Sequence, residues 1–132
     1  MVDVFCAATS LESGRFDAEV ARSSAEALGE RFAALKERGE GYLEVRGPES
    51  FPALTMGFRG PVAVIQAFTD EESISVLECD GSVQGEWVEV PVMDEDAIFS
   101  GHLGIETDRA WGVVQSFLLG RGLAELGDWF EL

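Results

Sequence analysis

The chain has 132 residues, 46% of them hydrophobic, and its 25 acidic side chains against 9 basic ones give a net charge of −16. This length and hydrophobic content predict one domain spanning residues 1–132 with a core of its own, and they exclude a disordered acidic tail. The charge repels phosphate backbones and anionic lipid, so we expect no direct nucleic-acid binding, no membrane binding and a basic partner.

The first elements expected along the chain are a short strand and a long helix. Residues 2–7 form a candidate strand. An apolar stripe at helical spacing then predicts a helix over about residues 18–38, with Asp17 as its N-cap and Gly39 as its stop. The stripe consists of Ala21, Ala25, Leu28, Phe32 and Leu35.

From Gly41 onward the hydrophobic pattern has the period of strands. The segments between the candidate strands are too short for crossover helices, so we expect an antiparallel meander. In the Glu-Trp-Val-Glu-Val segment, residues 86–90, the pattern does not decide which side of the strand is buried. The five candidate strands span residues 42–46, 53–58, 62–69, 74–79 and 86–92.

The last third of the chain is expected to add an acidic loop, a short strand and a second helix. The loop is Asp94-Glu95-Asp96, and the strand covers residues 103–106. Thr107 and Asp108 open a helix that runs to about residue 119 and stops at Gly120. A helix, a run of strands and another helix predict an α+β domain in which both main helices pack on one face of an antiparallel sheet.

Cysteine and histidine usage argues against metal or cofactor chemistry. Cys6 and Cys79 lie in apolar strand-like segments, where free cysteines behave as small buried hydrophobes. One histidine, His102, and no paired cysteine spacing predict no metal site, and no cofactor is expected. The chain has neither a signal-peptide pattern nor an apolar run of about 20 residues, so we expect a cytoplasmic protein.

No residue pattern indicates catalysis. Ser100 and His102 alternate along an extended segment, and a lone histidine near a strand is more often structural than catalytic. Nucleophile-elbow, phosphate-loop and dinucleotide motifs are missing from the sequence. We therefore predict that the chain is not an enzyme. An enzyme using His102 with a nearby acid is the minority hypothesis.

Acidic segments on strand connections and one tryptophan are the candidates for partner binding. Solvated charge on a connection can reach a partner, and tryptophan is enriched at interface hot spots. The alternatives are ordinary turn chemistry for the acids and core packing for the tryptophans, including Trp111. The candidate binding residues are Asp70, Glu71, Glu72, Trp87, Asp94, Glu95 and Asp96.

The order of residues in the last third carries a family resemblance. An isoleucine, a Leu-Gly-Ile strand, a helix with alanine and phenylalanine, a glycine-arginine stop and a tryptophan follow one another. This ending resembles that of the deaminase-associated immunity proteins of bacterial polymorphic-toxin systems, which are common in actinobacteria. Proline often follows the stop in that family, whereas this chain has Gly122. The residues are Ile98, Leu103-Gly104-Ile105, Ala110, Phe117, Gly120-Arg121 and Trp129.

The resemblance implies a non-enzymatic inhibitor that binds and neutralises a cognate toxin domain, often a nucleic-acid deaminase. An anionic protein suits this role because it can occupy a cationic substrate cleft. The family-matched residues Ala110, Phe117, Gly120 and Trp129 are expected to be structural. The alternative is a small cytoplasmic ligand-binding or regulatory domain with a sheet-lined cavity, unrelated to toxins.

Overall fold

An antiparallel sheet organises the computed structural model, which describes residues 4–47, 49, 51–78 and 86–131. Within this part of the chain the strand order is β10-β6-β5-β4-β3-β1-β2, and β9 pairs with the start of β5. Every pairing is antiparallel, so the predicted meander is confirmed for β3 to β6. The strands are β1 Val4–Thr9, β2 Phe16–Ser23, β3 Glu40–Arg46, β4 Ala53–Arg59, β5 Val62–Phe68, β6 Ile74–Leu77, β9 Ile105–Glu106 and β10 Trp129–Glu131.

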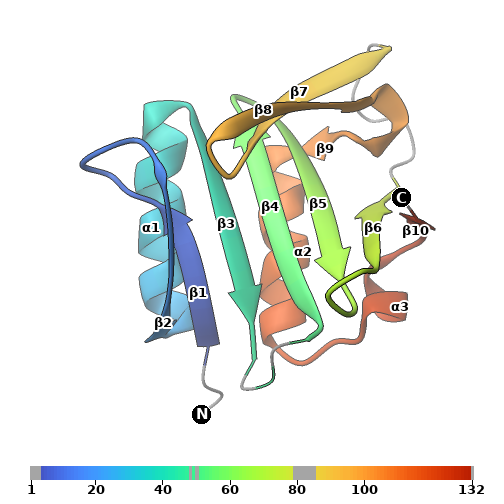
Figure 1. Ribbon diagram of the computed structural model, residues 1–132, viewed down its shortest axis with the longest axis horizontal. Helices are drawn as coiled ribbons and strands as arrows, with labels where there is room; N and C mark the ends of the chain where they lie inside the picture. Colours follow the sequence, from blue (N-terminus) through green and yellow to red (C-terminus); the bar gives the residue numbers. More distant parts are fainter. Residues whose placement is uncertain (1–3, 48, 50, 79–85, 132) are drawn as a thin grey trace.

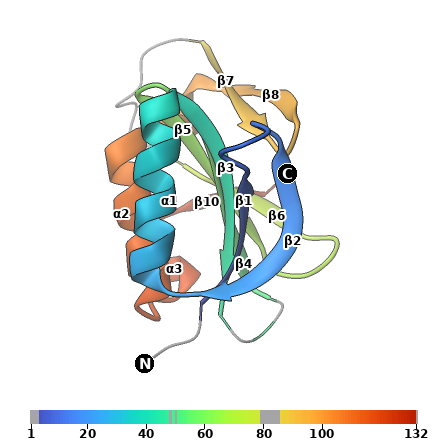
Figure 2. The ribbon, with the colours of Figure 1, turned by 90° about the vertical axis from the view of Figure 1, so that its left-hand side faces the viewer.

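Two helices cover one face of this sheet. Figures 1 and 2 show α1 (Ala25–Arg38) and α2 (Thr107–Leu118) side by side on that face. A 3-10 turn, η1 (Gly101–Leu103), precedes β9, and the short helix α3 (Leu123–Leu126) follows α2. The predicted α+β class, with both main helices on one face of the sheet, is confirmed. No helix in the described ranges is long and apolar enough to cross a membrane.

The main core lies between the sheet and these helices. Side chains alternate along a strand, so every second residue of the central strands points to the helices. On the helix side, Phe32 stacks on Trp111 with ring centroids 4.5 Å apart and an angle of 9° between the rings. The buried residues that meet here include Leu28, Phe32, Leu35, Leu43, Val45, Leu54, Met56, Phe58, Ala63, Ile65, Ala67, Ala110 and Val114.

The expected start of the first helix at Asp17 is wrong. Residues Phe16–Ser23 form β2, an edge strand that pairs with β1, and α1 begins only at Ala25. Ser24 is the true N-cap, because its Oγ accepts a hydrogen bond from the Ala27 N–H at 3.1 Å. Gly39, with φ of +99°, ends the helix as predicted. Pairing with a neighbouring strand overrides local helix propensity in this segment.

A separate hairpin crosses one end of the sheet on the face opposite the helices (Figures 1 and 2). It consists of β7 (Trp87–Val92) and β8 (Glu95–Ser100), joined through Met93 and Asp94. Its inner residues pack with the sheet in a second apolar cluster of Val64, Val76, Val88, Val90 and Leu103.

The expected acidic loop at residues 94–96 is therefore mostly strand. Only Asp94 lies in the turn, while Glu95 and Asp96 begin β8. The short strand expected over 103–106 is reduced to β9, because Gly101–Leu103 form η1. Cys79, the last residue of one predicted strand, lies outside the described residues.

Candidate functional site

The outer side of the β7–β8 hairpin carries exposed apolar side chains. Val88 and Val90 point to the sheet, so Trp87 and Glu89 point away from it. Ile98 pairs with Glu89 and shares its side. Trp87 is 62% exposed and Ile98 65% exposed. We name Trp87, Glu89, Asp96 and Ile98 the hairpin face.

Leaving side chains of this size in water forfeits the free energy of their burial, and Trp87 and Ile98 are diagonal neighbours on the same side of the hairpin. Met93, at the hairpin turn, is also half exposed. The hairpin also carries the exposed acids Glu89, Glu95 and Asp96, and Asp94 lies in its turn. An apolar centre with a charged rim is the usual composition of a protein-binding patch.

Arg59, at the end of β4, anchors the hairpin to the sheet. Its Nη1 donates to Glu89 Oε1 at 2.8 Å, and its Nη2 donates to Asp96 Oδ1 at 2.5 Å and to Glu40 Oε2 at 2.9 Å. Hydrogen bonds to Asp96 and then Glu40 raise the pKa of the Arg59 guanidinium above its ordinary value. Three carboxylates surround one guanidinium, so this ion-pair cluster carries a net negative charge.

A second contact fixes the hairpin turn. Asp94 Oδ1 accepts a hydrogen bond from the Phe16 N–H at 2.7 Å, which ties the turn to the start of β2. The carboxylates of Asp94 and Asp96 therefore make hydrogen bonds within the protein. Glu95, the third predicted acid of this segment, is exposed on β8 and takes no part in the contacts described above.

The other predicted acidic segment belongs to a turn between β5 and β6. Asp70 Oδ1 accepts the backbone N–H groups of Glu72 and Ser73, each at 2.8 Å, and Oδ2 accepts the Ser73 hydroxyl at 3.1 Å. The Glu72 N–H, followed by the Ser73 hydroxyl, lowers the pKa of Asp70. Glu71 and Glu72 are exposed.

The structure does not bring the two acidic segments together. The turn with Asp70 follows the end of β5, whereas the hairpin crosses the sheet near the start of that strand (Figure 1). The hairpin, and not the pair of acidic segments, is thus the surface that unites a predicted tryptophan with predicted acids.

His102 is the residue named by the minority enzyme hypothesis, and the structure places its ring beside that of Phe130. His102 is exposed in η1, and the two rings meet edge-on with centroids 6.1 Å apart. No acid or nucleophile in the described part of the chain hydrogen-bonds to His102. The described residues also contain no group of three or more His, Cys, Asp or Glu placed to hold a metal ion.

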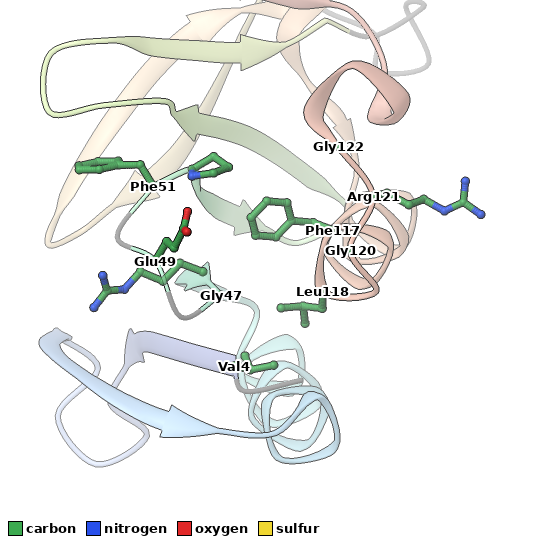
Figure 3. A pocket seen from close by; sticks show the side chains of 11 residues that line it. Val4, Gly47, Glu49, Phe51, Phe117, Leu118, Gly120, Arg121 and Gly122 are labelled. Carbon is green, nitrogen blue, oxygen red and sulfur yellow. The ribbon is translucent and has the colours of Figure 1, made fainter. Parts of the chain in front are cut away.

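A pocket of about 470 Å³ lies at the other end of the sheet (Figure 3). It opens between the β3–β4 connection and the end of α2. Val4, Phe117 and Leu118 supply apolar wall, and Phe51 with Pro52 faces them. The remaining lining residues are Arg46, Gly47, Glu49, Gly120, Arg121 and Gly122.

No protein-family model matches the chain. A comparison with curated proteins likewise found no match.

Ala110, Phe117, Gly120 and Trp129, the family-matched residues expected to be structural, lie in or beside the core or at the end of α2, whereas the matched Ile98 is exposed on the hairpin face. Ala110 is fully buried and Phe117 is half-buried beside the pocket. Gly120, which follows the α2 C-cap residue Leu119, has φ of +97°, a conformation that favours glycine. Trp129 packs at the edge of the core, and its Nε1 donates to the Leu123 carbonyl at 2.8 Å.

Sequence reasoning missed Ile98 as a surface residue and missed the pocket entirely. Local signal for the first was weak, because residues 95–100 read Glu-Asp-Ala-Ile-Phe-Ser, and the apolar run within them does not show which residue faces water. The pocket gave no local signal, because its walls come from β1, the β3–β4 connection and the end of α2, which are far apart in sequence.

Proposed function

We propose that the chain is a cytoplasmic, non-enzymatic inhibitor that binds and neutralises a basic toxin domain, of the nucleic-acid deaminase kind implied by the resemblance to immunity proteins. The observation that carries this proposal is the hairpin face. Trp87 and Ile98 are exposed there on a hairpin that Arg59 and Asp94 hold in place.

The composition of the hairpin face suits a basic partner. A net charge of −16 speeds encounter with a cationic domain, and the rim acids orient the approach. An aromatic anchor at the centre then slows release, because desolvated tryptophan often dominates binding energy. Holding the hairpin rigid lowers the entropy lost on binding.

We expect a basic toxin domain to be encoded beside this chain, and the test uses that domain as the partner. The two proteins are co-expressed, and affinity and residual deaminase activity are measured with wild type and Trp87→Ala. We expect about a 30-fold or greater loss of affinity, mostly through faster dissociation, and loss of inhibition. The matched control is Leu119→Ala, which removes a side chain that is 82% exposed at the other end of the molecule.

Added salt should slow association of the wild-type pair, because it screens the attraction between opposite charges. Lack of tight binding at low salt, where attraction is strongest, would rule out the inhibitor. If Trp87→Ala and Leu119→Ala changed the affinity equally, the chain could still be the inhibitor, but the hairpin face would not be its binding site.

The ligand-binding alternative has one specific observation in its favour, which is the apolar pocket. Its volume lies in the range of about 300–1,000 Å³ that small-molecule sites occupy.

A further inference from the structure

The hairpin has a free edge along β8. β7 packs on β3, β4 and β5 and pairs with β8, whereas β8 pairs with no other strand of the described chain. The two strands pair without a break from Trp87 opposite Ser100 to Val92 opposite Glu95. None of the six β8 residues is buried. The outer side of β8 is therefore a strand edge without a neighbour among the described residues.

A proline in β7 shows how the backbone groups of this hairpin alternate. In an antiparallel pair, opposed residues that exchange two N–H···O=C bonds alternate with opposed residues that exchange none. Pro91 has no N–H and lies opposite Asp96, so this pair is of the second kind. The Gly101 N–H donates to the Glu86 carbonyl at 2.9 Å just beyond the end of the ladder, which agrees with the same alternation.

Three residues of β8 consequently direct their backbone groups away from β7. Ile98 and Ser100 follow Asp96 at alternate positions and lie in pairs of the same kind. Their N–H and C=O groups point outward together with those of Asp96. This row of donors and acceptors is a template for one more strand.

The β8 edge lacks the features that protect the two edge strands of the main sheet. β2 is interrupted by a register shift between Cys6 and Ala8 of its neighbour, and β10 has three residues. Bulges and short strands hinder pairing with another chain. β8 has six residues in unbroken register, and they include neither proline nor lysine.

We propose that β8 takes up an added strand from the basic partner, so that hydrogen bonds between backbones supply part of the affinity. This inference rests on the proposed function for the partner and adds the mode of binding. The exposed carboxylates of Glu89, Glu95 and Asp96 favour lysine or arginine on the added strand. Ile98 and Trp87 favour an apolar residue between the basic ones. A second copy of this chain is disfavoured, because each copy carries a net charge of −16.

Hydrogen exchange of the β8 amides, measured by NMR, tests the added strand with the toxin domain as the partner. In the free protein the N–H groups of Asp96, Ile98 and Ser100 should exchange fast, whereas those of Ala97 and Phe99, which face β7, should exchange slowly. In the complex the first three should become protected at least about tenfold, because they gain carbonyl acceptors.

A backbone variant tests the same hydrogen bonds through affinity. Ser100→Pro removes one outward N–H and leaves the pairing with β7 intact. Ser100 has φ of −59°, close to the value that proline imposes, so we expect this variant to fold, which circular dichroism checks. Its affinity should fall about three- to tenfold, the value of one hydrogen bond. The matched control is Ser100→Ala, which keeps the N–H and should bind as the wild type does.

Two results would overturn the added strand while the inhibitor proposal stands. One is a complex in which the three outward amides exchange as they do in the free protein, and the other is equal affinity of Ser100→Pro and Ser100→Ala. A protein that dimerises with these amides protected would assign the edge to a second copy and overturn the basic strand as its occupant. Absence of any complex with the toxin domain would overturn both proposals.

Discussion

Tyr42, the only tyrosine of the chain, is a buried titratable group on the sheet face that the helices leave open. It is 1% exposed and meets the Phe16 ring edge-on at 5.0 Å. Burial raises the pKa of Tyr42 to about 12. The nearby Thr55 hydroxyl offsets part of this rise, although neither hydroxyl forms a hydrogen bond of standard geometry.

The raised pKa of Tyr42 predicts that the protein loses stability at alkaline pH. Unfolded tyrosine has a pKa of about 10, so the stabilisation is complete below about pH 10 and is lost as the pH rises toward 12. A shift of this size corresponds to about 2–3 kcal/mol at most. Tyr42→Phe should keep its stability at neutral pH, or gain up to about 1 kcal/mol, because no hydrogen bond of standard geometry is lost. It should also lose less stability at high pH.

Tyrosinate absorbance measures the pKa directly, since no other tyrosine contributes. Urea unfolding of both proteins at about pH 8 and about pH 11 measures the stability difference. Ionisation near pH 10 in the folded protein, or equal alkaline losses for the two proteins, would contradict the prediction.

At the scale of elements, the close packing of the β7–β8 hairpin on the sheet depends on Gly57 in β4. A Cβ at this position would overlap the Pro91 carbonyl oxygen, so the backbones of β4 and β7 approach closely only with glycine here. Gly57→Ala should lower the free energy of unfolding by about 1–3 kcal/mol through overpacking.

The matched control is Gly112→Ala in α2, where a Cβ meets no atom within 4 Å. Alanine should stabilise that helix by about 0.5–1 kcal/mol, because glycine loses more backbone entropy on folding. Urea unfolding measures both variants. A Gly57→Ala protein as stable as wild type would mean that the hairpin can shift without cost.

Element boundaries were predictable where a local signal agreed with the fold. The two-residue alternation of β3, β4 and β5 and the stripe of α2 led to the right elements at nearly the right bounds. The segment of residues 16–23 was not readable in the same way, because its acids and alanines also suit a helix. Pairing with β1 decides it, and that pairing is a contact between separate segments.

At the scale of the whole molecule, net charge opposes the compact state. The 25 acidic side chains outnumber the 9 basic ones, so repulsion outweighs attractive pairs such as those at Arg59. We expect the isolated protein to gain stability in urea when NaCl is raised from low concentration to about 0.5 M, because screening acts mainly on the repulsion.

The free energy of unfolding at both salt concentrations tests this expectation. The same screening weakens the Arg59 ion pairs, and this loss lowers stability and opposes the expected gain. A fall in stability with added salt would mean that these local pairs outweigh the global repulsion.

The candidate site was predictable in its residue types and not in its arrangement. Trp87, Asp94, Glu95 and Asp96 were recognised from the sequence as candidates, and the hairpin unites them. Their roles differ because of neighbours distant in sequence: Arg59 binds Asp96, and Phe16 binds Asp94. The Asp70 turn, in contrast, is made by its own adjacent residues, so its ordinary turn chemistry could be read locally.

The sequence by itself determined the α+β class, the meander of β3 to β6 and the two helices on one face, since periodicity and short connections are local properties. Tertiary structure decided which side of β7 faces water, which acids are held internally and where a pocket opens. In β7, Trp87 and the valines occupy opposite sides, so both sides carry large apolar groups. Only packing of the valines against Val64 and Val76 buries one side and leaves the tryptophan exposed.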